Sequence, residues 1–159
     1  MPAFMYIEGI KGEAEPKDYK DWIQISSMSC DIHRTVESGA KGPDRKRGGT
    51  MLGDVSVTRM MDSSSVPLQV ACAGGEVKNP IKIHLCVQSG QECKPVMTYE
   101  LQQAIISGYM CSASDGQPPS ENLTLNYEAV KWHYNKLDAA LNPVDNFPGA
   151  FNPQTMTNE

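Results

Sequence analysis

Alternating apolar and polar residues, which are typical of strands with one buried face, dominate the chain. The clearest alternation runs over residues 81–88 and predicts a strand with one apolar face and one wet face. A turn is predicted at residues 89–92 and a turn-rich loop at residues 114–120, both punctuated by glycine and serine. The predicted strands cover residues 4–8, 22–32, 52–61, 81–88, 97–102, 105–112 and 123–134.

Two of these strands change the parity of their apolar positions part of the way along. The change between Ile25 and Met28 predicts a bulge or bend at Ser26-Ser27. A second change, between Tyr127 and Val130, predicts another bend. Such bends allow a sheet to curl, and seven or eight strands without helical crossovers predict a mainly β fold, a largely antiparallel barrel or sandwich.

One short helix is predicted near residues 62–75. Asp62 or one of the three serines after it caps the start, and Pro67 fits an early position that needs no backbone amide. Leu68 and Ala71 begin a single apolar stripe, and a pair of glycines ends the helix. Because about ten residues are too few for a helix that is stable alone, we expect this helix to cover one face or mouth of the sheets.

Residues 38–50 contain four glycines, one proline and no large apolar residue, which predicts a long loop. Loops of this length in compact domains are usually functional or disordered. The stretch from Arg34 to Arg47 has five basic and two acidic residues, a net charge of +3, whereas the whole chain carries −5. The rest of the chain therefore carries −8. An acidic chain disfavours a nucleic-acid role, and the basic island predicts either contact with an acidic surface or a solvated loop tip.

The candidate catalytic groups have no convincing partners in the sequence. His33, His84 and His133 lack a carboxylate at suitable spacing, and Cys72 lies towards the C-terminal end of the predicted helix, where the helix dipole does not favour a thiolate. Nucleophile-elbow, phosphate-loop and His-Glu-x-x-His motifs are absent from the sequence. We therefore expect a binding or assembly protein, and a small barrel hydrolase using Cys72 or a histidine is the enzyme alternative.

The five cysteines contain no Cys-x-x-Cys pair, so we expect reduced thiols that pack as small hydrophobic groups. His84, Cys86 and Cys93 form a cluster across the predicted turn, but a zinc site normally needs a fourth ligand, and no second pair is near. No metal and no cofactor are expected.

The chain of 159 residues, 40% hydrophobic and 21% charged, fits one globular domain. No apolar run approaches the roughly 20 residues of a membrane helix, so membrane insertion is not expected. The first residues lack the basic head of a secretory signal peptide, so we expect any export to use a dedicated route. From about Asn142 the chain is rich in proline and asparagine and is expected to be a tail.

The order and spacing of several segments, over about residues 4–134, resemble the haemolysin-coregulated protein (Hcp) family. One of them is the run Val-Thr-Arg-Met-Met-Asp-Ser-Ser-Ser that leads into the predicted helix. Hcp proteins are the inner-tube subunits of bacterial type VI secretion systems. The segments that carry the resemblance are residues 4–13, 23–26, the basic loop, 57–65, 68–75, 99–101, 105–109 and 121–127.

The resemblance implies an antiparallel two-sheet β-barrel over residues 1–135, with a short flanking helix and a long extended loop at 38–50, followed by a tail at 136–159. With so short a tail we do not expect the toxin domain that some family members carry. The resemblance also implies homohexameric rings that stack into a tube, with effectors in the lumen and without catalytic activity.

The implied partners are other copies of the chain, a VgrG-type spike protein, a contractile sheath and effector proteins. The chain would lie in the bacterial cytoplasm before the sheath contracts and outside the cell, or in a target cell, afterwards. Lys41, Arg45, Lys46 and Arg47 are the candidate ring-stacking residues. The alternatives are a tail-tube protein of the kind found in contractile phages and a secreted binding module of similar fold.

Overall fold

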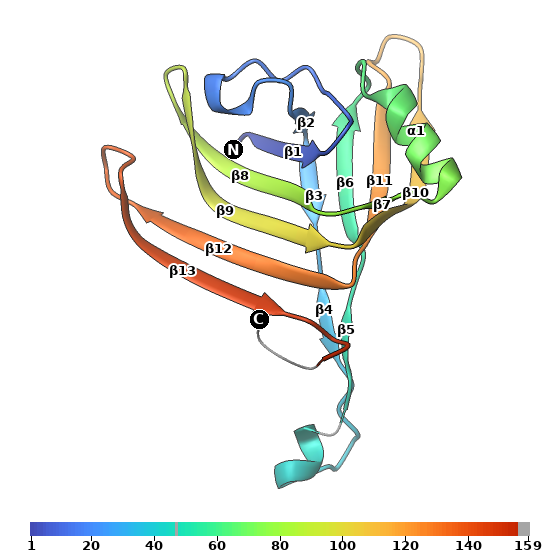
Figure 1. Cartoon of the computed structure of the whole chain (residues 1–159), viewed down its shortest axis with the longest axis vertical. Coiled ribbons are helices and arrows are strands. Elements are labelled where there is room, and N and C mark those ends of the chain that lie inside the picture. Colours follow the sequence, from blue (N-terminus) through green and yellow to red (C-terminus); the bar gives the residue numbers. More distant parts are fainter. Residues whose placement is uncertain (47, 156–159) are drawn as a thin grey trace.

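Two antiparallel sheets and one α-helix form the body of the molecule, and the computed structural model describes residues 1–46 and 48–155, without the side chain of Lys46 (Figure 1). Sheet A has the strand order β13-β12-β9-β8-β1-β2. Its strands are β1 (Ala3–Ile7), β2 (Ile23–Ile25), β8 (Ile81–Ser89), β9 (Glu92–Gln102), β12 (Ala129–Leu137) and β13 (Pro143–Phe151). Sheet B has the order β3-β6-β11-β10-β7. Its strands are β3 (Ser27–Ser29), β6 (Val55–Met60), β7 (Val77–Lys78), β10 (Ala104–Ser112) and β11 (Ser120–Asn126).

The predicted mainly β fold, with two antiparallel sheets and one helix, is confirmed. The barrel is not closed, because the strand ladders of sheets A and B remain separate in the described part of the chain. The strands at one corner, β2 and β3, have three residues each and are too short to carry one continuous ladder around it.

Both predicted bends are confirmed, and each marks a point where the chain passes from one sheet to the other. Ser26 separates β2 in sheet A from β3 in sheet B, and its amide donates to the carbonyl of Thr58 at 2.7 Å. Residues 127–128 likewise separate β11 in sheet B from β12 in sheet A. A parity change arises because the apolar side chains must face the same core from two sheets of different orientation.

The main core lies between the two sheets and below the helix. Burying each large side chain of this kind contributes about 1.5–3 kcal/mol. The core residues with no exposed surface are Met5, Ile23, Val57, Leu68, Ile81, Ile83, Leu101, Ala104, Leu123 and Leu125.

Helix α1 (Ser65–Gly74) packs against β10 and buries Leu68 and Ala71. It ends as predicted at the glycine pair, because Gly75 adopts a left-handed conformation with φ of 62° and its amide donates to the last carbonyls of the helix. At the start, the Asp62 carboxylate accepts a hydrogen bond from the Ser64 amide at 2.7 Å.

The outer face of β8 is not wet, so that prediction was wrong. Residues 8–22, which include η1 (Lys17–Tyr19), fold back over this face and bury Tyr19. The alternation of β8 shows only that one of its faces meets the main core. The other face is covered by a segment about 65 residues earlier in the chain. This satellite cluster consists of Phe4, Ala14, Tyr19, Cys86 and Cys93, with Trp22 partly buried beside it.

The segment expected to be a tail contains a strand, β13, that the sequence pattern did not predict. β13 pairs antiparallel with β12 and forms the edge of sheet A (Figure 1). It was missed because an exposed edge strand need not alternate, and its prolines at 143 and 148 are typical of loops. The division of the chain at residue 135 stays a prediction.

Candidate functional site

An arm projects from the body at one end of the long axis of the molecule (Figure 1). We define the arm as residues 32–52. Its stem is a separate ribbon of β4 (Ile32–Arg34) and β5 (Thr50–Leu52), and its tip contains the 3₁₀ turn η2 (Gly42–Lys46). The predicted loop at residues 38–50 therefore sits at the end of a two-stranded stem, which places it far from the core.

The arm exposes large apolar side chains on its stem and just beyond it. Ile32 is 53% exposed, Val36 is 47% exposed and Met51 is 67% exposed. The Arg34 guanidinium donates to the hydroxyl of Thr50 across the ribbon at 3.2 Å. Large exposed apolar groups on an extended two-stranded ribbon are typical of a surface that meets another protein.

The structure places the four predicted ring-stacking residues unevenly. Lys41 lies just before η2 and Arg45 lies within it, and both are exposed. Lys46 ends the turn, but its side chain lies outside the described residues, as does the whole of Arg47. The position of the basic island at the tip of an arm thus follows from Lys41 and Arg45.

Gly48 allows the two sides of the arm to approach each other closely. A Cβ atom at this position would collide with the backbone carbonyl of Thr35, and the Thr35 amide donates to the Gly49 carbonyl at 3.0 Å. Gly48 therefore has a steric role in the arm, whereas a Cβ at Gly49 would meet open space.

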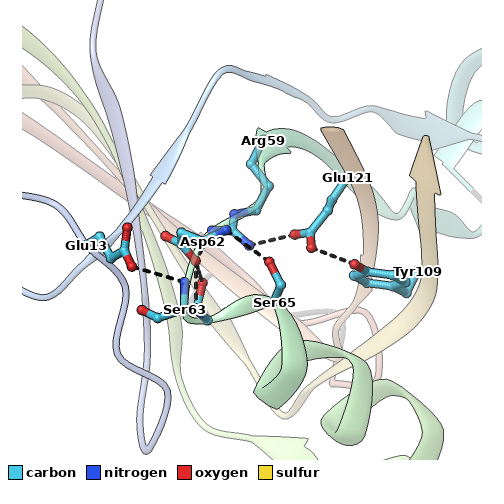
Figure 2. A network of polar contacts seen from close by, with 8 residues as sticks. Glu13, Arg59, Asp62, Ser63, Ser65, Tyr109 and Glu121 are labelled. Carbon is cyan, nitrogen blue, oxygen red and sulfur yellow. Dashed lines mark hydrogen bonds and ion pairs between the residues drawn. The ribbon is translucent and has the colours of Figure 1, made fainter. Parts of the chain in front are cut away.

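A buried ion pair lies at the end of β6 that is farther from the arm. The Arg59 guanidinium Nη1 lies 2.6 Å from Glu121 Oε2, and neither side chain has exposed surface (Figure 2). The hydroxyl of Tyr109 donates to the other oxygen of Glu121 at 2.5 Å, and burial together with this carboxylate raises the pKa of Tyr109. These contacts connect β6, β10 and β11 of sheet B.

The same guanidinium also reaches the start of α1. Arg59 Nη2 lies 2.5 Å from Asp62 Oδ1, and the carboxylate also accepts from the amide and the hydroxyl of Ser64. Burial raises the pKa of Asp62, but the hydrogen bonds from Ser64 and Arg59 outweigh it, so the pKa lies below its ordinary value. Arg59 therefore fixes the helix start to sheet B.

Sequence reasoning missed this network, although a signal was present. Arg59 occupies the apolar parity of β6 set by Val55 and Val57, and Glu121 occupies the apolar parity of β11 set by Leu123. Two opposite charges on the inward parity of two strands predict a buried pair only if the strands are neighbours, and the sequence alone does not fix that.

The outer face of sheet B combines many hydroxyl and amide groups with the exposed Met60 and Met110, and its paired strand positions carry no charge. Rows of hydroxyl and amide side chains run across β3, β6 and β11. Ser107, at a bulge in β10, adds hydrogen bonds to Thr124 at 2.9 Å and to Asp54 at 2.8 Å. On these three strands the outward hydroxyl and amide residues are Ser27, Ser29, Ser56, Thr58, Ser120, Asn122, Thr124 and Asn126.

The histidines and Cys72 do not come together. His33 lies on the arm, with Nε2 at 2.6 Å from Asp31, and His133 lies on β12. His84 Nδ1 shares a hydrogen bond of 3.0 Å with the hydroxyl of Tyr19, and burial, followed by the charge of Lys82, lowers the pKa of His84 to about 4. Cys72 packs against the main core from α1.

The cysteines behave in two ways. Cys86 and Cys93 are buried as predicted, and burial raises the pKa of both thiols. Cys30 and Cys111 are exposed, so the prediction of packing groups was wrong for these two. Among the described residues, no three His, Cys, Asp or Glu side chains are placed to hold a metal ion.

Together these features define a class of protein: a two-sheet β domain that presents a projecting arm and an uncharged polar face. The family model for "Type VI secretion system effector, Hcp" matches residues 4–134. The chain belongs to the Hcp family of type VI secretion proteins.

Individual relatives agree with this assignment. The chain is 26% identical over 140 residues to protein hcp1 of Pseudomonas aeruginosa, covering 86% of each. A solved type six secretion system protein shares the fold with a TM-score of 0.89, 24% identity and 99% coverage of both chains. Hcp1 from Salmonella typhimurium has a TM-score of 0.76 at 16% identity, covering 99% of this chain and 98% of that one. In the described residues, no helix has the length and apolar character needed to cross a membrane.

Proposed function

We propose that the chain is a structural subunit of a type VI secretion tube. Six copies close into a ring, and rings stack into a tube that carries effectors and is itself exported. The projecting arm is the observation that carries this proposal, and membership of the Hcp family supports it. A VgrG-type spike and a contractile sheath are the further partners, and the chain passes from the cytoplasm to the outside when the sheath contracts.

The arm suits the stacking step for two physical reasons. Its exposed apolar groups, Ile32 and Met51, lose contact with water when a neighbouring ring covers them. Its basic tip meets an oppositely charged body, because the chain outside residues 34–47 carries −8. Exposed ion pairs contribute at most about 1 kcal/mol each, but six arms act at every ring junction, and salt weakens them.

The outer face of sheet B suits the wall of the lumen. A tube that carries cargo proteins must bind them only weakly. A charged wall would bind proteins of the opposite surface charge tightly. Hydroxyl and amide groups such as Thr58 and Asn122 offer hydrogen bonds to any polar surface without this selectivity. We therefore place this face towards the lumen.

The test separates ring formation from stacking. We expect a variant with Arg45→Glu, Lys46→Glu and Arg47→Glu to form hexamers in native mass spectrometry but no tubes in electron micrographs. The matched control is Lys11→Glu, Lys17→Glu and Lys20→Glu, which makes the same charge change at exposed sites of the body and leaves tube growth intact.

Tubes of normal length from the arm variant would show that the basic island is only a solvated loop tip. A wild-type chain that remains monomeric at micromolar concentration would contradict the ring itself.

A further inference from the structure

Sheet A is longer than the surface that sheet B covers. Its four longest strands continue past the edge of sheet B, as Figure 1 shows on the side away from α1. On β8 and β9 the outer face of this part lies under residues 8–22, whereas on the inner face Tyr134 and Phe147 remain about half exposed in the described part of the chain. We call the inner face of this extension the overhang.

The overhang continues the apolar surface of the main core into solvent. Across β9 and β12, Leu101 and Val130 are buried, and the next pair, Tyr99 and Trp132, still packs partly against the core. One pair further out, Tyr134 lies opposite Met97 on one side and Phe147 on the other. Tyr134 is 44% exposed and Phe147 is 53% exposed.

These two aromatic rings lie 6.1 Å apart, centroid to centroid, on neighbouring strands. Large aromatic side chains and methionine are enriched in the centres of protein interfaces, where charged residues are depleted. The position of Tyr134, Phe147 and Met97 on one sheet face therefore indicates a surface that another protein covers.

The opposite side of the molecule presents a second apolar face. The outward surface of α1 exposes Val66 by 67% and Val70 by 58%, and their i,i+4 spacing places them on the same side of the helix. No residue from 65 to 74 is charged. A solvent-facing helix normally carries charged residues on this side, so this helix also has a face without a partner.

We propose that the overhang of one copy covers the outward face of α1 on the next copy, and that this contact closes the ring. The inference rests on the proposed function, because it names the two surfaces of the ring joint. The occupant is a second copy because one chain carries both apolar faces and holds them on opposite sides (Figure 1). The helix face has no charged residue, and on the overhang charges begin only at the next pair beyond Tyr134 and Phe147, which is Lys136 and Asp145. Two different faces that meet give a heterologous contact, which repeats around an axis and closes into a ring.

Two single substitutions test the contact from its two sides. Val70→Glu places a charge on the helix face, and Phe147→Glu places one on the overhang. Both positions are exposed in the single chain, so the folded state should survive, and thermal melts check this. We expect each variant alone to be monomeric in native mass spectrometry, whereas Met51→Glu on the arm remains hexameric.

Mixing the two variants gives the decisive result. The Val70→Glu chain keeps an intact overhang, and the Phe147→Glu chain keeps an intact helix face, so the mixture has one good contact per pair. We expect a one-to-one heterodimer that grows no further.

Other outcomes overturn the inference. Hexamers from either variant would show that its surface is not in the joint, while the proposed ring would stand. Monomeric variants that stay separate on mixing would show that the two faces do not meet. A monomeric wild-type chain would instead remove the ring on which the inference rests.

Discussion

Charged side chains are buried near one end of β6 and exposed in the arm that precedes its other end. At the far end, Arg59 is fully buried and contacts the carboxylates of Glu121 and Asp62 (Figure 2). The arm precedes the first residue of β6. Lys41 and Arg45 are exposed at its tip, at the end of a two-stranded stem.

This difference separates stability from assembly. A charge removed from water destabilises the fold unless its partners remain in place, so the network acts on the free energy of unfolding. A charge that stays in water contributes little to folding and remains available to a partner. Substitutions at the two ends should therefore change different measurements.

The largest effect is expected when the buried pair is broken from one side. Glu121→Ala leaves the Arg59 guanidinium with less compensation and Tyr109 without its acceptor, and it should lower the free energy of unfolding by about 3–5 kcal/mol in urea titrations. Glu128→Ala, at an exposed acid, is the matched control and should change it by less than about 0.5 kcal/mol. Equal small losses would contradict the comparison.

A smaller effect is expected at the cysteines, where burial also differs but no charge is involved. Cys86→Ser places a hydroxyl in the satellite cluster and should lower the free energy of unfolding by about 1–3 kcal/mol. Cys111→Ser, at an exposed thiol, should be nearly neutral. We also expect a chain with all five cysteines replaced by serine to form rings of lower stability. Stoichiometric zinc in the purified protein would overturn the view that the buried thiols are packing groups.

The smallest effect is expected at the arm. Arg45→Ala should change the free energy of unfolding by less than about 0.5 kcal/mol, because the side chain lies in water at the tip. We expect this variant to need a higher protein concentration than the wild type before tubes appear. Added salt should reduce the difference between the two concentrations. A large loss of stability without any change in tube growth would place Arg45 in the fold instead of in assembly.

Local patterns in the sequence were enough to predict most strands of the body and its helix. Alternation located most of the strands, and the two parity changes marked the two crossings between sheets, at Ser26 and at residues 127–128. The helix was predictable because its cap, its stripe and its terminal glycines lie within about 14 residues of each other. The composition of residues 38–50 located the tip of the arm, but not the ribbon that carries it.

The features that the sequence did not predict depend on contacts between segments far apart in the chain. Residues 8–22 cover the outer face of sheet A at β8 and β9, and the alternation of β8 does not predict this cover. β13 joins the sheet through backbone pairing with β12, which its prolines and its lack of alternation conceal. Arg59 and Glu121 are acceptable in the core only because β6 and β11 are neighbours, and the sequence by itself does not determine that pairing.

The sequence by itself therefore determined which residues alternate, bend and turn, since those preferences depend on neighbours within a few positions. The tertiary structure decided which faces are covered and which remain open, since that depends on the relative lengths and order of strands far apart in the chain. The overhang shows this most clearly: Tyr134 continues the apolar parity of Val130 and Trp132 in the sequence, and only the shorter reach of sheet B leaves it exposed.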